Sequence, residues 1–214
     1  NWLHKIKLDW TKFQSIHAVD SYKQELSYVL DKYKDIFQEG CGNFNGPPIK
    51  LFLDPAVTPK FFKARNIPHA LKDKVEIEHD RLQSEGIIKA VQFSDWSSPC
   101  VPVLKDQGKS VRLCGDYSRT TNLALAHDPY PLPLIEYLFT KLAGGKQFSK
   151  IDLSQAFQQL SLHPDSQECT TINTHRGLFQ YLRLPFKINQ CPSIFQRFMD
   201  KLLKDCPSTC AYID

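Results

Sequence analysis

Apolar residues recur at three- and four-residue steps in several stretches of the chain, which is the spacing of one face of a helix. These stretches are residues 22–37, 70–85, 134–142 and 192–203. A glycine closes each of the first three, and a proline precedes or opens each of the last three, as is typical of helix ends and starts. The pattern therefore predicts a helix in each stretch, and a shorter helix is expected after Ser154.

Short stretches of β-branched and alternating apolar residues predict strands. They cover residues 49–53, 101–104, 111–113, 147–151 and 209–214, together with a hairpin-like stretch over 169–184. Residues 105–110 are polar and contain Gly108, which indicates the tip of a hairpin. The order of helices and strands predicts a mixed α+β fold, and this order is compatible with a split βαβ arrangement.

Composition narrows the function only slightly. The chain has 214 residues, 42% hydrophobic and 23% charged, with a net charge of +4, enough for one sizeable domain or two small ones. The small positive charge suits a polyanionic partner but does not select one. The 7 cysteines include no C-x2-C pair, which favours reduced thiols in an intracellular protein, in cytoplasm or nucleus. No apolar run approaches the roughly 18 residues of a membrane span, so no membrane partner is expected.

Two aspartates could carry chemistry. Asp152 follows a short apolar stretch, and a carboxylate at the end of a strand can bind a metal ion in a cleft. Taken alone, it is more simply read as the cap of the short helix that follows, because aspartate is a good N-cap residue. Asp214 ends Tyr212-Ile-Asp214 and could equally be an exposed terminal residue. Periodicity alone does not bring the two carboxylates together.

Several ordered motifs resemble the reverse transcriptases of gypsy-type LTR retrotransposons. They are Arg112-Leu-Cys-Gly-Asp-Tyr117, Tyr130-Pro-Leu-Pro133, Phe148-Ser-Lys-Ile-Asp-Leu-Ser-Gln-Ala-Phe-Gln-Gln-Leu160, Thr174-His-Arg-Gly-Leu-Phe-Gln-Tyr181, Leu184-Pro-Phe-Lys-Ile-Asn-Gln-Cys-Pro-Ser-Ile-Phe-Gln196 and Tyr212-Ile-Asp214. The last matches the start of the family's Y-x-D-D box. The resemblance runs from about residue 20 to the end of the chain, in the family's order and at its spacings.

The resemblance implies a right-hand polymerase fold, with fingers and an incomplete palm built on a split βαβ, ferredoxin-like core. Residues 1–20 would be a linker or docked arm after a preceding polyprotein segment, 21–147 mainly fingers, and 148–214 a partial palm that stops inside the Y-x-D-D box. The implied activity is RNA-directed DNA polymerisation. The implied partners are an RNA or DNA template, a DNA primer and deoxynucleoside triphosphates, and the oligomeric state is left open.

The resemblance also implies roles for individual residues. Asp152 and Asp214 would be catalytic carboxylates that hold two Mg²⁺ ions, with Mn²⁺ as an alternative, and the third carboxylate would be the next residue along. Phe157 would lie under the sugar and exclude a 2′-hydroxyl; its alternative is a core phenylalanine. Lys105 and Arg112 would grip the triphosphate, because phosphate contacts need charge-assisted donors; their alternative is solvated charge on a hairpin.

One motif departs from the family pattern. Lys187 stands where the family's Leu-Pro-Phe-Gly motif has glycine, and if its φ is positive the lysine costs about 1–2 kcal/mol. Together with the missing third carboxylate, this departure leads us to expect that the chain by itself is catalytically incompetent. Two alternatives stay open: a non-catalytic nucleic-acid-binding remnant, and a degenerate product without a stable fold.

Overall fold

The computed structural model describes residues 20–38 and 40–213, so the arm predicted over residues 1–20 lies, except for its last residue, outside the described residues. The chain forms two compact units that are interleaved along the sequence. Unit 1 comprises residues 1–45, 129–159 and 192–214, and unit 2 comprises residues 46–128 and 160–191. The compact units are therefore discontinuous, whereas the sequence predicted two contiguous regions that meet between residues 147 and 148.

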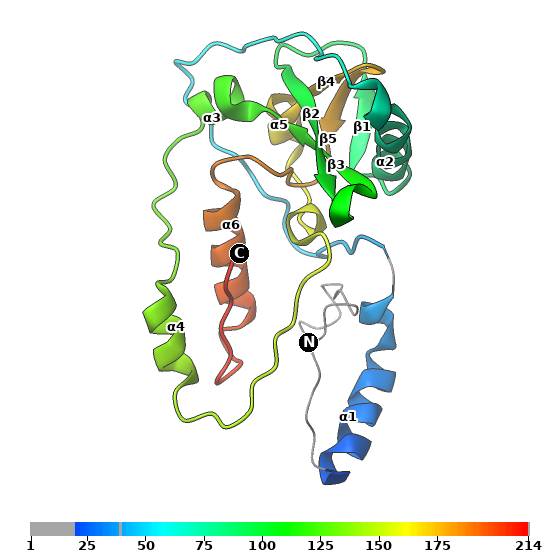
Figure 1. The fold of residues 1–214 in the computed structure, drawn as a ribbon. Coiled ribbons are helices and arrows are strands. Elements are labelled where there is room, and N and C mark those ends of the chain that lie inside the picture. The colour runs from blue at the N-terminus through cyan, green and yellow to red at the C-terminus, as the bar shows by residue number, and fades with distance from the viewer. Residues whose placement is uncertain (1–19, 39, 214) are drawn as a thin grey trace. The chain divides into compact units, whose positions relative to one another are not determined.

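Unit 2 is built on a five-stranded mixed sheet with the order β1-β5-β4-β2-β3 (Figure 1). The strands are β1 (Ile88–Val91), β2 (Ser98–Lys105), β3 (Ser110–Gly115), β4 (Ile172–Thr174) and β5 (Gly177–Tyr181). Strand β2 pairs parallel with β4, and the other neighbours pair antiparallel. The predicted hairpins over 101–113 and 169–184 are both present, and with the helices they confirm the mixed α+β class.

Helix α2 (Lys72–Ser84) packs against β3, and it follows a turn of 3-10 helix, η4 (His69–Leu71). Its buried residues Val75, His79 and Leu82 lie three and four positions apart, which places them on one face of the helix. The charged residues of α2 mostly occupy its other face. The helix ends before Gly86, whose φ of 63° is a left-handed conformation that favours glycine.

The ring of His79 is fully buried, with an exposed fraction of 0%. It meets the Phe179 ring edge to face, with 4.3 Å between centroids. Neither ring nitrogen has a hydrogen-bond partner among the described residues. Burial therefore lowers the pKa of His79 below its ordinary value of 6.5, and the positive charge of Arg176 adds to the effect.

Lowering the pH through 6.5 is expected to destabilise unit 2. The unfolded chain takes up a proton on His79 near that pH, whereas the folded chain resists it, so the unfolded state binds more protons as pH falls. The urea midpoint should therefore drop between about pH 7 and 5.5. The variant His79→Phe keeps an aromatic ring without nitrogens and should show a smaller drop. An equal drop in the two proteins would contradict this assignment.

A second group, Glu76, titrates at a lower pH than His79. The carboxylate of Glu76, on the same helix, has its pKa lowered below 4.5, chiefly by its hydrogen bond with His175. Its stabilising effect is present above pH 4.5 and is lost only as the pH falls through the lowered pKa. Measurements kept above about pH 5.5 therefore leave Glu76 mostly ionised in both states.

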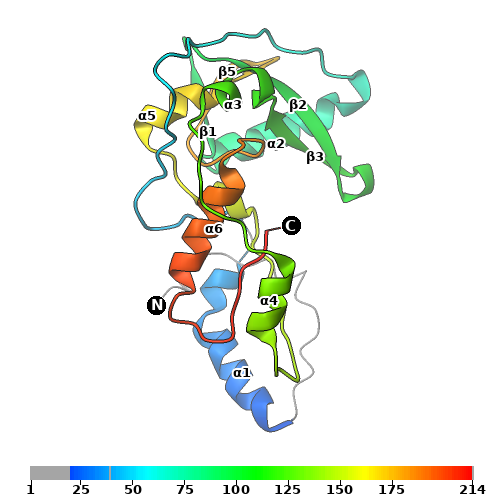
Figure 2. The same cartoon turned by 90° about the vertical axis from the view of Figure 1, so that its left-hand side faces the viewer.

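Unit 1 contains the longest helices outside α2. These are α1 (Asp20–Lys32), α4 (Ile135–Leu142) and α6 (Cys191–Leu202), the last of which extends one residue beyond unit 1 at its start. The stretches predicted as helices over 22–37, 134–142 and 192–203 match them, with the 3-10 turn η3 (Lys34–Phe37) continuing the first. Figure 2 shows the same elements from a second direction.

Aromatic rings hold part of unit 1 together. Phe195 and Phe198 of α6 lie 5.7 Å apart between centroids, and Phe44 meets Phe198 edge to face at 4.6 Å. The backbone amide of Phe44 also donates to the carbonyl of Gln159 at 2.7 Å. These contacts bring Phe44 to α6 and to the segment that contains Gln159.

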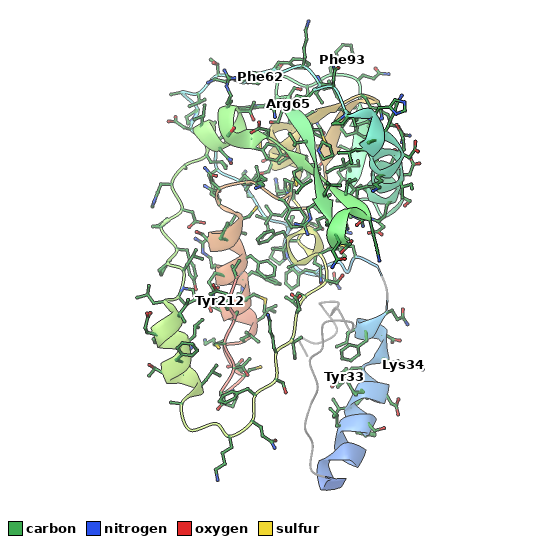
Figure 3. The ribbon with its side chains drawn as sticks, in the orientation of Figure 1. Tyr33, Lys34, Phe62, Arg65, Phe93 and Tyr212 are labelled. Atoms are coloured by element: carbon green, nitrogen blue, oxygen red, sulfur yellow. The ribbon has the colours of Figure 1, made fainter. Side chains whose placement is uncertain are left out.

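Three predicted strands are wrong. Residues 147–151 and 209–213 form no strand, and 49–53 makes only isolated bridges, from Ile49 to Leu162 and from Leu53 to Leu125. A strand is held by hydrogen bonds to a neighbouring strand. In the described part of the chain neither 147–151 nor 209–213 is paired with a strand, and Tyr212 is 58% exposed (Figure 3).

The remaining short elements connect the larger ones. They are η5 (Asp106–Gly108), η6 (Tyr117–Arg119), α3 (Thr121–Ala124), η7 (Ala156–Gln159), α5 (Pro164–Gln167) and η8 (Glu168–Thr170). Within residues 20–213, residue 39 aside, no helix is both long enough and apolar enough to cross a membrane.

Candidate functional site

Asp152 and Phe157 lie on one segment of unit 1. Asp152 is half-buried in an irregular stretch, four residues before η7, so it does not occupy the N-cap position of that helix. Phe157 lies within η7 and meets Phe195 of α6 edge to face, with 5.3 Å between centroids. The Gln159 side chain donates to the Ser154 carbonyl at 2.6 Å, which closes the turn between them. Phe157 is thus half-buried and packed against α6.

Asp214, the residue predicted to bind metal together with Asp152, is the last residue of the chain. Asp214 lies outside the described residues, and Tyr212 precedes it in an irregular segment. Among the described residues no three His, Cys, Asp or Glu side chains gather closely enough to hold a metal ion. The pairing of Asp152 with Asp214 therefore stays a prediction.

A cavity of ≈ 690 Å³ lies elsewhere in unit 1, between the Tyr130–Pro133 segment, α4 and residues 196–211. The Tyr130 hydroxyl donates to Asp200 at 2.6 Å, and Gln196 donates to the same carboxylate at 3.0 Å. The other amide atom of Gln196, Oε1, is buried without a hydrogen-bond partner in the described residues. Neither Asp152 nor Phe157 lines this cavity, so it is separate from the predicted catalytic segment.

Lys105 and Arg112 lie on one face of the β2–β3 hairpin in unit 2. Lys105 pairs with Ser110, and Val103 pairs with Arg112, so the two cations are diagonal neighbours on that face. Val111 and Leu113 alternate with Arg112 and are buried toward α2. The cations therefore occupy the face of the hairpin opposite α2. The hairpin tip is tethered separately, because Lys74 of α2 donates to the Gly108 carbonyl.

Arg112 has a contact that its place in the sequence did not predict. Its guanidinium lies over the ring of Phe186, 4.2 Å from the centroid. Phe186 precedes Lys187 in the Leu-Pro-Phe-Lys motif, so the turn that carries this motif lies against the hairpin. No local pattern signals the contact, because 74 residues separate the two side chains (186 − 112).

Lys187 has a φ of 72°, the left-handed conformation for which the family's glycine is suited. Asn122 braces the turn on both sides: its Nδ2 donates to the Lys187 carbonyl at 2.9 Å, and its Oδ1 accepts from the Asn189 amide at 3.0 Å. Ile188, between them, is 2% exposed. These contacts hold the backbone in place although the lysine side chain is exposed, and sequence reasoning missed the role of Asn122.

Replacing Lys187 by glycine is expected to raise the free energy of unfolding by about 1 kcal/mol. The left-handed conformation costs a non-glycine residue roughly 1–2 kcal/mol, and the greater flexibility of glycine in the unfolded chain offsets about half of that gain. The variant Lys187→Ala removes the same charge but keeps the unfavourable φ, so its stability should stay within about 0.5 kcal/mol of the parent. Urea unfolding of the three proteins provides the measurement, and a glycine variant no more stable than the alanine variant would contradict the expectation.

A separate cluster of polar and aromatic contacts surrounds the start of β2 in unit 2. The Arg119 guanidinium lies over the Phe62 ring at 5.0 Å, and Arg65 donates to Asp116 at 2.6 Å (Figure 3). This ion pair and the hydrogen bond from Ser118 lower the pKa of Asp116, with the Ser118 bond as the larger cause. Asp116 follows β3 directly, so the motif Arg112–Tyr117 is anchored at its end.

Comparison with known proteins gives one family match. Residues 104–214, just over half of the chain, match the family described as reverse transcriptase (RNA-dependent DNA polymerase). An uncharacterized protein of Caenorhabditis elegans is 33% identical over 94% of this chain, and the retrovirus-related Pol polyprotein from transposon 412 of Drosophila melanogaster is 29% identical over 83%. The chain spans only 16% and 15% of the lengths of these two relatives.

Solved structures show the same fold. The foamy viral protease-reverse transcriptase in complex with an RNA/DNA hybrid is 26% identical, with a TM-score of 0.80 over 92% of this chain and 27% of that one. A crystal structure of the prototype foamy virus protease-reverse transcriptase reaches a TM-score of 0.82 at 23% identity, over 92% of this chain and 26% of that one. These likenesses confirm the predicted fold class.

Proposed function

Because this chain belongs to the reverse transcriptase family, we propose that it supplies the fingers and part of the palm of an RNA-directed DNA polymerase. The observation that carries the proposal is the family match, because it runs through both Asp152 and Asp214. In this reaction a primer 3′-hydroxyl attacks the α-phosphate of a nucleotide and pyrophosphate leaves. The name of the transposon relative, a Pol polyprotein, supports the same activity.

We further propose that unit 2 forms the fingers and that unit 1 contributes to the palm. Unit 2 carries the hairpin with Lys105 and Arg112, whereas unit 1 carries the segment with Asp152 and Phe157. This assignment keeps the fingers and palm predicted from sequence but divides each of them along the chain. Residues 160–191 then belong to the fingers, although they follow the first palm segment.

The metal proposed for the site is Mg²⁺, with Mn²⁺ as an alternative, and enzymes of this family generally depend on divalent metal ions. Asp152 offers a half-buried carboxylate, and hard oxygen donors of this kind suit Mg²⁺. Asp152 and Asp214 would hold the ions, and the bound metal would lower the pKa of the primer hydroxyl and offset charge on the leaving group. The carboxylate oxygens of Asp152 are a suitable donor for this metal ion. That Asp214 lies close enough to Asp152 to share the ions is part of the proposal.

The residues proposed to contact nucleotide divide between the units. Phe157 is half-buried and meets Phe195 edge to face, and its ring would limit the sugar pocket. Lys105 and Arg112 share one face of the hairpin and would bind the triphosphate. The template and primer proposed for this chain follow from its foamy viral relatives, whose structures contain an RNA/DNA hybrid or double-stranded DNA.

We propose that a polypeptide of residues 1–214 does not extend a primer by itself. It supplies two of the three carboxylates that the family resemblance implies. The second candidate function, binding of nucleic acid without catalysis, is favoured by one observation: the cationic hairpin face is formed without any contribution from Asp214.

A chimaeric polymerase tests the proposal. In it, residues 1–214 replace the equivalent segment of the foamy viral protease-reverse transcriptase, so that the remaining palm and the thumb are supplied. We expect Mg²⁺-dependent incorporation of deoxynucleotides on a DNA-primed RNA template. A chimaera that unfolds in a single cooperative transition and binds the template but incorporates nothing would overturn the polymerase proposal and leave the binding function.

A further inference from the structure

The turn that contains Lys187 brings this residue to the same face of the hairpin as Arg112. Phe186, the residue before Lys187, lies under the Arg112 guanidinium at 4.2 Å. The Cys114 thiol follows Arg112 by two residues and shares its face. Burial raises the pKa of Cys114, while the positive charges of Arg112 and then Lys187 act to lower it.

The carboxylate of Glu78 belongs to α2, on the opposite side of the sheet from this face, and it is already paired. The carboxylate that acts on the Cys114 thiol is Glu78, and Arg81 donates to it from the same helix at 2.8 and 3.0 Å. In contrast, no hydrogen bond or ion pair engages the side chain of Lys105 or Lys187 within the described residues. Within residues 20–38 and 40–213, no carboxylate pairs with the ammonium group of Lys105 or Lys187, so this face carries unpaired positive charge.

The backbone of Lys187 is held in an unfavourable conformation by contacts that do not involve its side chain. The φ of 72° is fixed by the two hydrogen bonds to Asn122 and by the burial of Ile188. Backbone strain of this kind persists where the surrounding structure determines it, and it is common at binding sites. The result is an ammonium group on a flexible stem that starts from a fixed Cα.

We propose that Lys187 is a third binding residue for the polyphosphate of a nucleoside triphosphate, beside Lys105 and Arg112. This inference rests on the proposed function, because it assigns a further residue to the same nucleotide. The stacking of Arg112 on Phe186 uses the face of the guanidinium and leaves its edge N–H groups to donate to phosphate oxygens. The glycine of the family motif has no charge to offer at this position, so the departure adds a phosphate contact.

Binding of inorganic tripolyphosphate to the 214-residue chain, measured by calorimetry at low salt, tests the proposal. We expect Lys187→Gly to weaken binding about tenfold, since a hydrogen bond to a charged group contributes on that order. Lys187→Arg keeps the charge and should remain within about twofold of the parent. The matched charge control is Lys72→Ala, on α2 and the other side of the sheet, which should bind like the parent.

Stability separates the binding effect from unfolding. Because Lys187→Gly is expected to unfold at higher urea than the parent, weaker tripolyphosphate binding by this variant cannot come from a loss of folded protein. Unchanged tripolyphosphate affinity in Lys187→Gly would overturn the proposal. The proposal also fails if Lys187→Gly weakens binding of a single-stranded oligonucleotide but not of tripolyphosphate, because Lys187 would then contact a strand and not the nucleotide.

A failure of the inference about Lys187 can be distinguished from a failure of the proposed polymerase function. If tripolyphosphate affinity depends on Lys105 and Arg112 but not on Lys187, the inference fails while the proposed nucleotide site stands. If the folded chimaera incorporates no nucleotide, the proposed polymerase function fails in a separate assay that does not involve the Lys187 variants.

Discussion

Replacing Asp152 by asparagine is expected to lower nucleotide incorporation by the chimaeric polymerase by at least about a thousandfold. The substitution is nearly isosteric, but an amide carries no charge to hold a divalent ion. Metal stabilisation of charge in such reactions contributes several kcal/mol, and each 1.4 kcal/mol corresponds to about a factor of ten in rate. Primer extension under single-turnover conditions, at saturating Mg²⁺, is the measurement.

Two controls make this result specific. Asp205 is an exposed aspartate of the same unit, after α6, and Asp205→Asn should extend primers at the parent rate. The binding of a primed RNA template should change less than about threefold in Asp152→Asn, because phosphate contacts come mainly from cations. A variant at Asp152 that retains a tenth or more of the parent rate would remove this residue from the proposed metal site.

Replacing Ile172 by alanine is expected to lower the free energy of unfolding of unit 2 by about 3–4 kcal/mol. Ile172 is 0% exposed and lies in β4, where it pairs with Phe179 of β5 and with Ser98 of β2. Removal of its side chain leaves a cavity at the centre of the sheet that neighbouring strands cannot fill by moving. Urea unfolding followed by far-ultraviolet circular dichroism gives the change.

The matched control is the same substitution on the surface. Ile77 of α2 is 71% exposed, and Ile77→Ala should change stability by less than about 0.5 kcal/mol. A cooperative urea transition in the parent would also exclude the degenerate alternative, which has no stable fold. Equal effects of the two isoleucine substitutions would mean that unit 2 does not pack as described.

Local pattern was sufficient to predict the four longer helices, α1, α2, α4 and α6, and the two hairpins, whereas the short helices α3 and α5 were not predicted. The apolar residues of α6 and the buried face of α2 repeat at helical spacing, and the β2–β3 tip contains Gly108 with a φ of 85°. The strand predicted over 147–151 and the described part, 209–213, of the strand predicted over 209–214 are absent for a different reason. An apolar stretch shows that a segment can form a strand, but the partner that completes a strand is determined by tertiary structure, which no local pattern specifies.

In the candidate site, too, contacts within one hairpin could be predicted from the sequence, and contacts between distant segments could not. The diagonal placement of Lys105 and Arg112 could be predicted from the hairpin, because register follows from a short tip. The stacking of Arg112 on Phe186 and the hydrogen bonds from Asn122 to the turn at Lys187 could not be predicted from the sequence. Each joins residues that are more than 60 positions apart, 74 in the first case (186 − 112) and 65 in the second (187 − 122), and depends on how the turn after β5 returns to the hairpin.

The interleaving of the two units has a consequence for synthesis on the ribosome. Unit 2 is complete once residue 191 has been made, whereas unit 1 also requires the segment from Pro192 onward. A growing chain can therefore close the sheet of unit 2 while the first two segments of unit 1, residues 1–45 and 129–159, still lack α6. Chains stalled shortly after residue 191 has emerged should already resist protease across 46–128, and resistance of the helical unit should appear only with later stalls.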